Sequence, residues 1–461
     1  MADSSGGGSR DSRDVYRTLD LALRVGEVLL SSGAGAADVG ATMLNVARAC
    51  GLRTVTADVT FTELAMSHQT SFDEPALIQL RQVRHREIDY GDLTHVDHLV
   101  RDLLAGRIDR AEARARLARV VSSGHRLPRW AATLGYGAMG GGVGLLVGGS
   151  WRVALLAAGA SMGVDLIQRE MSTRRWPSFY QQVAGGLFAT LIAVLAAASG
   201  TDLSPSLVIT AGIIMMLAGV SFMGAIQDAL TGYPLTAGAR ILEAMLATAG
   251  LIAGVSGGLA VSRMLDVDLG RLDPGATLLG DIPLMSLGSA LAAAAFAFAS
   301  YAPLRSLLPI ATIAGVAQLV NLVVQDAGLG IAWGAAVAAV LIGVVSFSVA
   351  GRVRVPPLVV VVPAVVPMLP GLSIYRGLSL MAEGEDGILP IAKAAAIAIA
   401  LAAGVIFGEY LAQPLKREAR RLETRLAGPR LVGPLRMHTH RPRRHRSRGA
   451  KDSPAGQDVP G

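Results

Sequence analysis

The first 125 residues have the pattern of a soluble domain. Apolar residues recur at helical spacing through the first fifty positions, whereas between residues 53 and 82 β-branched and polar residues alternate, as they do in strands. Two amphipathic helical segments follow, and Asp92 and Asp109 are their predicted N-caps. The pattern predicts a soluble α/β domain over residues 13–125, with two helices, three strands and two helices in that order.

From Trp130 onward the pattern changes to long apolar runs that almost lack charge. Residues 282–350 contain just two charged side chains, Arg305 and Asp326. A helix needs about 20 mostly apolar residues to cross the hydrocarbon core of a bilayer. The pattern therefore predicts an all-α polytopic membrane protein with about ten spans behind the soluble domain. The expected spans lie near residues 131–149, 151–168, 178–199, 205–223, 239–262, 282–301, 303–323, 331–350, 355–381 and 388–411.

Charge is concentrated at the C-terminal end of the chain. Of a net charge of +7, residues 414–461 supply 13 Lys and Arg against 4 acidic residues, whereas residues 1–130 contain 17 Arg and 17 acidic residues. A basic tail behind a last span favours a cytoplasmic position near anionic membrane lipid over a nucleic-acid site. We predict no nucleic-acid partner, and we expect residues 1–12 and 428–461 to be disordered.

The positive-inside rule gives a separate test of the span count. With a cytoplasmic N-terminus, the connections on the inner side of the predicted spans carry seven Arg and those on the outer side carry three. The rule therefore supports ten spans in a multi-pass protein of the cytoplasmic (inner) membrane, with both termini in the cytoplasm.

Two stretches of the membrane region resemble each other. In residues 218–255 and 370–405, Gly219 and Ser221 match Gly371 and Ser373. The two stretches are spans 4–5 and spans 9–10, so they are offset by five spans and cross the membrane in opposite directions. Inverted repeats of this kind are typical of secondary transporters. Chance similarity between Ala- and Gly-rich helices is the alternative. The predicted halves are residues 131–262 and 282–411.

Ionisable groups at membrane depth are the sharpest chemical signal, because each costs about 2.5–3.5 kcal/mol at a helix centre. Glu243 and Lys393 lie one turn into spans 5 and 10, where a functional role is favoured, and Glu243 is a candidate for coupling export to protons. Asp165, Asp228 and Glu409 lie near span ends, where an interfacial position alone explains them. The candidate substrate- or ion-binding residues are Gly219, Ser221, Asp228, Arg240, Glu243, Gly371, Ser373, Arg376 and Lys393.

Several kinds of catalytic chemistry are missing from the chain. All eight His lie outside the predicted spans, the single Cys50 excludes a multi-cysteine metal site, and no phosphate-binding loop motif occurs. We therefore predict no catalytic residue, no metal site and no cofactor other than a coupling ion. A membrane enzyme remains a weaker alternative to a transporter that is driven by a gradient.

Four segments carry a resemblance to a known family. They are LLSSGAGAADVGATMLNVARACGLRTVTADVTFTELAMS, WPSFYQQVAGGLFATLIAVL, GAIQDALTGYPLTAGARILEA and PMLPGLSIYRGL. Together and in this order, over roughly residues 14–412, they resemble the threonine/serine exporter family. The first-half signature departs from the family pattern, since Ala218-Gly219 and Gly224-Ala225 stand where the family usually has Pro-Gly and Asn-Ala. Asp228, Gly238 and Arg240 are kept.

The resemblance implies a ten-span inner-membrane carrier that exports threonine and serine and is driven by the proton motive force. Some relatives of the family, in which the two halves are separate proteins, are linked to succinate export. We therefore expect a secondary active exporter of small polar amino acids, with H⁺ as the coupling ion. A dicarboxylate exporter is the alternative. The pattern leaves the oligomeric state open, a homo-oligomer included.

Overall fold

The computed structural model describes residues 5–70, 75–83, 88–124, 127–199, 204–267, 282–382 and 384–426. Within these ranges, side chains are described for residues 13–412 except residue 382. The predicted tail at 428–461 lies outside the described residues. Residues Met1–Leu415 form one compact unit, and the following paragraphs concern this unit.

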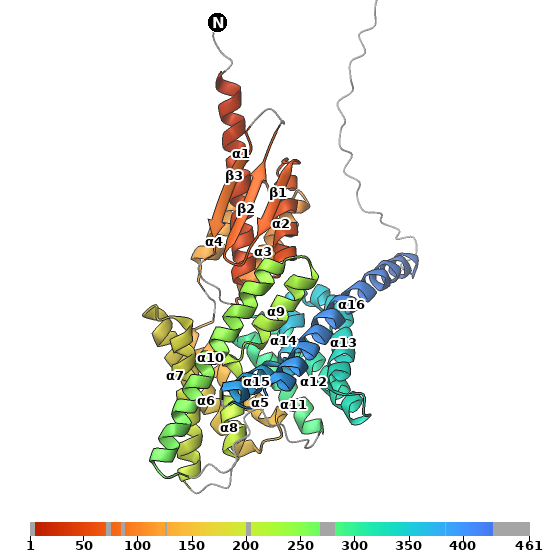
Figure 1. Cartoon of the computed structure of the whole chain (residues 1–461). Coiled ribbons are helices and arrows are strands. Elements are labelled where there is room, and N and C mark those ends of the chain that lie inside the picture. Colours follow the sequence, from red (N-terminus) through yellow and green to blue (C-terminus); the bar gives the residue numbers. More distant parts are fainter. Residues whose placement is uncertain are drawn as a thin grey trace, which may run out of the picture. The chain divides into compact units, whose positions relative to one another are not determined.

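The N-terminal part contains two helices, three strands and two helices, in the order that the sequence predicts (Figure 1). The three strands form one antiparallel sheet in the order β1-β2-β3. The first helix begins within the segment that was expected to be disordered. The elements are α1 (Ser5–Ser31), α2 (Ala36–Ala49), β1 (Val55–Val59), β2 (Glu63–His68), β3 (Leu77–Gln82), α3 (Tyr90–Leu104) and α4 (Arg110–Ser122).

The central strand supplies the inner face of this small sheet. Leu64 and Met66 of β2 are fully buried, and α1 and α2 pack against the sheet. Leu19 from α1 and Met43 from α2 complete the apolar layer between helices and strands. The alternation that predicted strands therefore also decides which face is covered, because successive side chains of a strand point to opposite faces.

The N-caps of α3 and α4 test the sequence prediction in detail. Asp109 caps α4 as expected, and its carboxylate accepts a hydrogen bond from the Glu112 amide at 2.7 Å. The prediction for Asp92 is wrong, because Asp89 caps α3 by accepting from the Asp92 amide at 2.8 Å. The helix starts a turn earlier than expected because Tyr90 is buried in the structure, which local spacing does not reveal.

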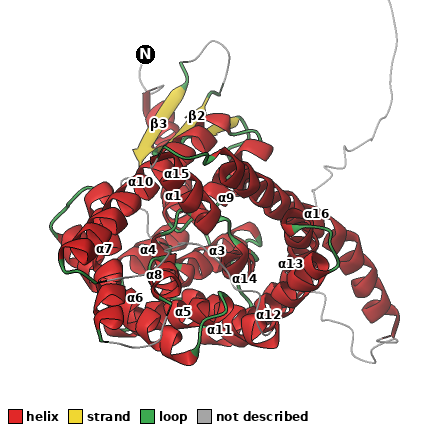
Figure 2. Ribbon diagram, turned by 60° about the horizontal axis from the view of Figure 1, so that its bottom comes forward, coloured by secondary structure: helices red, strands yellow, loops and turns green. Residues whose placement is uncertain are grey.

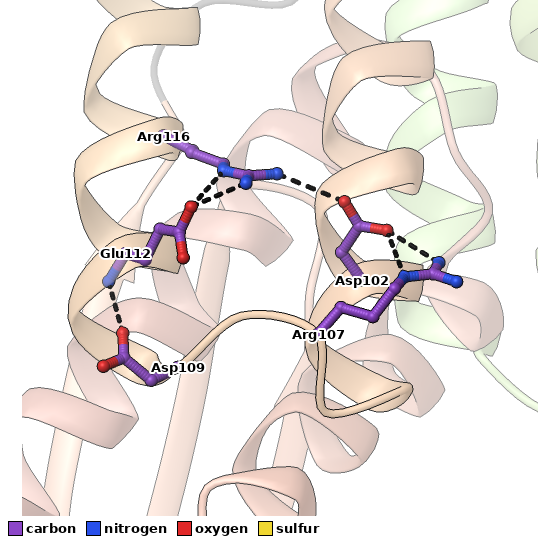
Figure 3. A network of polar contacts seen from close by, with 5 residues as sticks. All are labelled: Asp102, Arg107, Asp109, Glu112 and Arg116. Carbon is purple, nitrogen blue, oxygen red and sulfur yellow. Dashed lines mark hydrogen bonds and ion pairs between the residues drawn. The ribbon is translucent and has the colours of Figure 1, made fainter. Parts of the chain in front are cut away.

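A chain of charged side chains holds α4 against α3 (Figure 3). Arg116 of α4 contacts Glu112 of its own helix at 2.6 Å and reaches across to Asp102 of α3 at 3.2 Å. The same Asp102 accepts from Arg107 in the connecting turn. These groups are largely exposed, so each pair contributes modestly, at most about 1 kcal/mol. They fix the orientation of α4.

The membrane part begins at α5 and consists of helices. Two helices are interrupted by a short 3₁₀ turn and an extended residue, and they bend by 42° and 45°. The elements are α5 (Arg129–Leu146), α6 (Trp151–Thr173), α7 (Ser178–Ala198), α8 (Pro205–Gly212), η1 (Ile214–Met216), α9 (Gly219–Leu230), α10 (Pro234–Met264), α11 (Ile282–Ala299), α12 (Leu304–Asp326), α13 (Ile331–Val353), α14 (Leu358–Val365), η2 (Val366–Met368), α15 (Gly371–Ala382) and α16 (Ile388–Leu426).

Among the described residues, six helices are long and apolar enough to cross a membrane, and the two bent pairs bring this number to eight. The protein is therefore a multi-pass membrane protein. The other two predicted spans correspond to α5 and α6, which are not among these eight. Glycine is abundant in α5, and α6 carries charged residues at both ends, so their mean hydropathy is low.

Three helices of the first half have the same length as their counterparts in the second half. The first helix of each half, α5 or α11, has 18 residues, and the second, α6 or α12, has 23. Each broken helix consists of 8, 3 and 12 residues. In Figure 2, α6 and α7 lie on one side of the bundle and α12 and α13 on the other, while α5 and α11 lie next to each other between them.

The contact between α5 and α11 brings two backbones together at glycines. A Cβ atom added to Gly142 would lie 2.7 Å from the Ala292 backbone nitrogen and 2.9 Å from the Gly288 carbonyl oxygen. Real Cβ atoms are essentially never that close to another heavy atom. Small residues at membrane-helix contacts allow this close packing, which joins the two halves.

We expect Gly142→Ala to lower the thermal unfolding midpoint, Tm, of the detergent-purified protein. The new methyl group meets backbone atoms that cannot rotate away, and such overpacking costs about 1–3 kcal/mol. Gly159→Ala on α6 is the matched control, because its Cβ atom would meet nothing within 4 Å. Equal Tm values for the two variants would contradict the backbone contact.

Candidate functional site

A cavity of about 1190 Å³ lies inside the compact unit. Both interrupted helices line it, together with parts of α10, α12 and α16. The turn between α1 and α2 lines it as well, so the N-terminal domain contributes to the wall. A cavity of this size has room for a small metabolite and for the water around it.

The two helix interruptions meet at the cavity wall. A Cβ atom on Gly219 would lie 2.9 Å from Leu369 Cβ and 3.4 Å from the Gly371 nitrogen. Conversely, a Cβ atom on Gly371 would lie 2.8 Å from Leu217 Cβ and 3.5 Å from the Gly219 nitrogen. The N-termini of α9 and α15 therefore start side by side, and only glycine fits at either start.

The arrangement of these two N-termini has an electrostatic consequence. The first amides of a helix have no partner within the helix, and the N-terminal end carries about half a positive charge. Two such ends next to one another, beside a cavity, favour an anionic group there. Ser221 and Ser373, two residues after these glycines, are half-buried and add hydroxyl groups at corresponding positions.

Eight of the nine residues proposed from the sequence line this one cavity, although they come from four helices. The exception is Asp228. Glu243, Arg376 and Lys393 have exposed side chains. The eight lining residues are Gly219, Ser221, Arg240, Glu243, Gly371, Ser373, Arg376 and Lys393.

Asp228 is buried and joins the membrane helices to the N-terminal domain. Its Oδ2 atom lies 3.2 Å from Arg240 Nε, and the two side chains are 1% and 10% exposed. Its Oδ1 atom accepts a hydrogen bond of 3.0 Å from the Ala36 amide at the start of α2. Because Gly35 provides no side chain to cap that helix, the carboxylate of Asp228 acts as its cap from a distance of 192 residues in sequence.

Arg240 is held in the same contact. Its guanidinium covers Gly224, where a Cβ atom would clash with Nη1, and its Nη2 atom lies 3.5 Å from the Ala34 carbonyl oxygen. The opposite charges of Asp228 and Arg240 therefore compensate each other in the protein interior. Together the two side chains contact the backbone of Ala34 and Ala36, on either side of Gly35. A buried pair of this kind is stable only with both partners present.

Three more contacts join the N-terminal domain to the membrane helices. Thr236 of α10 donates to the Val59 carbonyl at 3.3 Å, and the Tyr90 amide donates to the Ser300 carbonyl at 2.9 Å. His98 of α3 lies 3.1 Å from the Arg354 carbonyl. The domain therefore contacts the connections α9–α10, α11–α12 and α13–α14.

Tyr90 is a lining residue that the sequence did not indicate. It is 1% exposed, its ring packs edge-on against Phe296 at 6.3 Å between centroids, and it lines the cavity. Burial raises the pKa of its hydroxyl, with a smaller contribution from Tyr136. The hydroxyl therefore stays neutral at physiological pH. Nothing in the local pattern marks this tyrosine, because its burial depends on α11.

Two amides of α12 also line the cavity. Gln318 is 5% exposed and Asn321 is 7% exposed. The sequence shows that these two residues are three positions apart in a nearly uncharged segment, but it does not show whether their side chains face the cavity or the lipid. Among the residues that the structure describes, no group of three or more His, Cys, Asp or Glu could hold a metal ion.

A family model described as "Putative threonine/serine exporter" matches residues 20–262, and a second model described as "Threonine/Serine exporter, ThrE" matches residues 285–411. The chain is 35% identical over 436 residues to the "Probable threonine/serine exporter" of Mycobacterium tuberculosis (strain ATCC 25618 / H37Rv), with 92% of this chain and 82% of that protein covered. It is 33% identical over 429 residues to the "Threonine/serine exporter" of Corynebacterium glutamicum, with 89% and 85% covered. The chain belongs to the threonine/serine exporter family.

Membership of the threonine/serine exporter family makes this protein a membrane transporter and not an enzyme. No solved structure matches the chain significantly. The names of the two relatives mention no dicarboxylate, so the comparisons give no support to that alternative. The first family match ends at residue 262 and the second begins at residue 285, and these limits fall close to the ends of the two predicted halves.

We expect Asp228→Asn to lower the Tm markedly, because it leaves Arg240 as an unpaired charge in a buried place. Removing one partner of a buried pair costs about 3–5 kcal/mol. The asparagine keeps an oxygen for the Ala36 amide, so the change tests the charge rather than the cap. Thermal unfolding of the purified protein measures the effect.

Asp326→Asn provides the control for this variant, since Asp326 is exposed at the end of α12 and undergoes the same chemical change. If Asp228→Asn unfolded at the same temperature as Asp326→Asn, the buried pair would not stabilise the contact between domain and membrane helices.

Proposed function

We propose that this protein exports threonine and serine across the cytoplasmic membrane, with a substrate site at the two helix interruptions. The observation that carries the proposal is the meeting of Gly219 and Gly371 at the wall of the cavity. Interrupted helices that meet in this way are the usual substrate site of secondary transporters. The printed names of the two relatives support the choice of substrate.

The charges of the cavity suit a zwitterion. The amides at the starts of α9 and α15 would bind the carboxylate of the amino acid, with Arg376 and Lys393 as cations on the same wall. Glu243 is the acidic lining residue of α10, and it would face the ammonium group or take up a proton. Arg240 instead stabilises the domain contact, because its guanidinium is already paired with Asp228.

Ten spans in two inverted halves remain our proposal for the architecture. The equal lengths of the first two pairs of helices and of the broken pair support it. So does the similarity between Thr133-Leu134-Gly135 of α5 and Ser286-Leu287-Gly288 of α11, which lie at the same distance from each helix start. At about 1.5 Å per residue, α6 is about 35 Å long, which is enough to cross about 30 Å of hydrocarbon. With 18 residues, α5 is about 27 Å long and lies at the short end of the range of about 17–25 residues for a span.

Contacts of the N-terminal domain support the orientation. With ten spans, the connections α9–α10, α11–α12 and α13–α14 all lie on one side of the membrane, and the domain contacts each of them. Arg354 lies in one of these connections, and Arg240, Arg305 and Arg352 lie in the helix ends next to them. The positive-inside rule puts such span ends in the cytoplasm. Cytoplasmic termini follow from the same argument.

The domain would also close the cavity towards the cytoplasm. The turn Ser31–Gly35 and the ring of Tyr90 line the cavity from this side, and the pair of Asp228 and Arg240 holds the turn in place. Alternating access requires that a substrate site opens to one side at a time. We call Ser31–Gly35 and Tyr90 the inner gate, and its release would admit the amino acid.

Export from cells tests the proposed function. Cells that lack their own exporters would be loaded with a threonine-containing dipeptide and with succinate, with and without an uncoupler. We expect uncoupler-sensitive release of threonine and no release of succinate. Glu243→Gln should abolish the proton-coupled export at unchanged membrane expression, because the amide cannot exchange a proton. Glu385→Gln, in the exposed connection before α16, is the control.

Release of succinate alone would move the assignment to dicarboxylates. If neither compound were released, the proposed transport activity would be wrong. Full export by Glu243→Gln would exclude this side chain as the group that couples export to protons.

A disulfide across the inner gate tests whether the gate must open. A Cβ atom on Gly91 would lie 3.9 Å from Tyr301 Cβ, which is within the range of about 3.5–4.5 Å found in disulfides. Gly91→Cys combined with Tyr301→Cys, in a Cys50→Ser background, should form a bond that keeps the neighbouring Tyr90 in the cavity. We expect the oxidised protein to lose export and a reductant to restore it.

The two single-cysteine variants are the controls for this pair, and peptide mass spectrometry would verify the bond. Unchanged export by fully cross-linked protein would show that Tyr90 does not leave the cavity during transport.

A further inference from the structure

Three amide side chains form a ladder along α12. Gln318, Asn321 and Gln325 are three and four residues apart, so they lie on one helical face, and all three line the cavity. Gln325 Nε2 donates to Asn321 Oδ1 at 2.9 Å, and Asn321 Nδ2 donates to Gln318 Oε1 at 3.3 Å. In this ladder each amide nitrogen donates to the side-chain oxygen of the preceding amide, so the N–H groups of Gln318 are its last donors.

The end of the ladder opens onto the cavity. Within the described residues, Gln318 Nε2 makes no hydrogen bond to the protein, and the residue is 5% exposed. This nitrogen is not among the fully enclosed side-chain atoms that lack a partner, so the small exposed part of Gln318 includes its free donor at the cavity wall. A fully enclosed amide without a partner would cost roughly 1–3 kcal/mol, and a polar group bound in the cavity would give this donor a partner.

Three buried hydroxyl groups elsewhere in the membrane helices behave differently. Thr190 donates to the Gly186 carbonyl and Thr248 to the Ala244 carbonyl, each at 2.8 Å within its own helix. Ser306 likewise donates to the Pro303 carbonyl. These side chains satisfy themselves locally, whereas the amide of Gln318 is directed to a wall of the cavity and has no such partner.

At the corresponding positions of the first half, two polar side chains are hydrogen-bonded to each other. Thr133 and Asp165 occupy the fifth residue of α5 and the fifteenth of α6, and Thr133 Oγ1 donates to Asp165 Oδ2 at 2.6 Å. Ser286 and Gln318 occupy the same places in α11 and α12. Among the described residues, Ser286 Oγ is buried with no hydrogen-bond partner, so the second half does not form the corresponding pair and the Gln318 amide is not held by α11.

We propose that Gln318, at the end of the ladder with Asn321 and Gln325, binds the side-chain hydroxyl of the substrate. This assignment rests on the proposed function, which already gives the carboxylate to the helix starts and the ammonium group to Glu243. The hydroxyl is the remaining polar group of threonine and serine. An amide offers donors and acceptors next to one another, and a hydroxyl needs one of each.

Such a subsite explains how the transporter would reject apolar amino acids of the same size. A site built to hydrogen-bond a substrate hydroxyl rejects the analogue that lacks it by up to about 10⁴–10⁵-fold, because its buried polar groups are then left unpaired. A purely apolar pocket discriminates by about 10²-fold at most between such isosteres. The ladder also fixes the orientation of Gln318, since Asn321 holds its oxygen.

Transport competition in proteoliposomes tests the assignment. The purified full-length protein would be given threonine against 2-aminobutyrate, which lacks only the hydroxyl, and the ratio of the two kcat/KM values would be measured. For the wild-type protein we expect a ratio above roughly 100. Gln318→Met, which keeps the length of the side chain and packs adaptably, should lower the ratio to below roughly ten through a loss for threonine alone.

Gln181→Leu is the control, because this residue of α7 donates to the Trp176 carbonyl and does not line the cavity. Gln318→Leu is the second variant, should the methionine variant fail to fold. An unchanged ratio in a folded Gln318 variant would overturn the hydroxyl subsite. A wild-type protein that transports threonine and 2-aminobutyrate equally would overturn it without any variant. Transport of neither threonine nor serine would instead overturn the proposed function.

Discussion

Backbone hydrogen bonding inside a membrane is the constraint on which this structure depends. A helix satisfies all of its own amides, and an interruption leaves several without partners, which hydrocarbon does not tolerate. The chain interrupts two helices, and the interruptions at Leu217 and Leu369 lie against each other at a cavity wall. Gly219 and Gly371, two residues further on, allow this contact. Both glycines line the cavity, and in the proposed mechanism a substrate carboxylate would complete the hydrogen bonding of the amides at these helix starts.

A second constraint is the cost of burying charge. Asp228 and Arg240 are both buried, and each is acceptable only because the other is present. Asp228 also completes the hydrogen bonding at the start of α2, so one carboxylate satisfies an arginine and a helix N-terminus together. This explains how the N-terminal domain is held against α9 and α10. It also means that the domain contact and the cavity share Arg240, which lines the cavity.

The two halves use corresponding positions in different ways. In the first half, Thr133 and Asp165 pair with each other, and Arg240 pairs with Asp228. In the second half, Ser286 and Gln318 stand at the positions of Thr133 and Asp165, but within the described residues Ser286 Oγ has no hydrogen-bond partner, so this pair is not formed. In the proposed mechanism, the first half holds the turn of the inner gate through Asp228 and Arg240, whereas α12 of the second half binds the substrate hydroxyl. The same positions therefore serve different tasks, because their polar side chains differ.

The sequence by itself determined those features that depend on neighbours along the chain. Apolar runs gave the limits of most spans to within a few residues, glycines indicated the two interruptions, and Asp109 was recognisable as an N-cap. Tertiary structure decided whatever depends on residues far apart in the chain. Asp89 rather than Asp92 caps α3 because Tyr90 is buried against Phe296 of α11. The partner of the α2 N-terminus lies 192 residues away, and the orientation of Gln318 depends on how α12 packs. A local pattern records helical periodicity and the cost of charge, but it does not record which distant group will neutralise that charge.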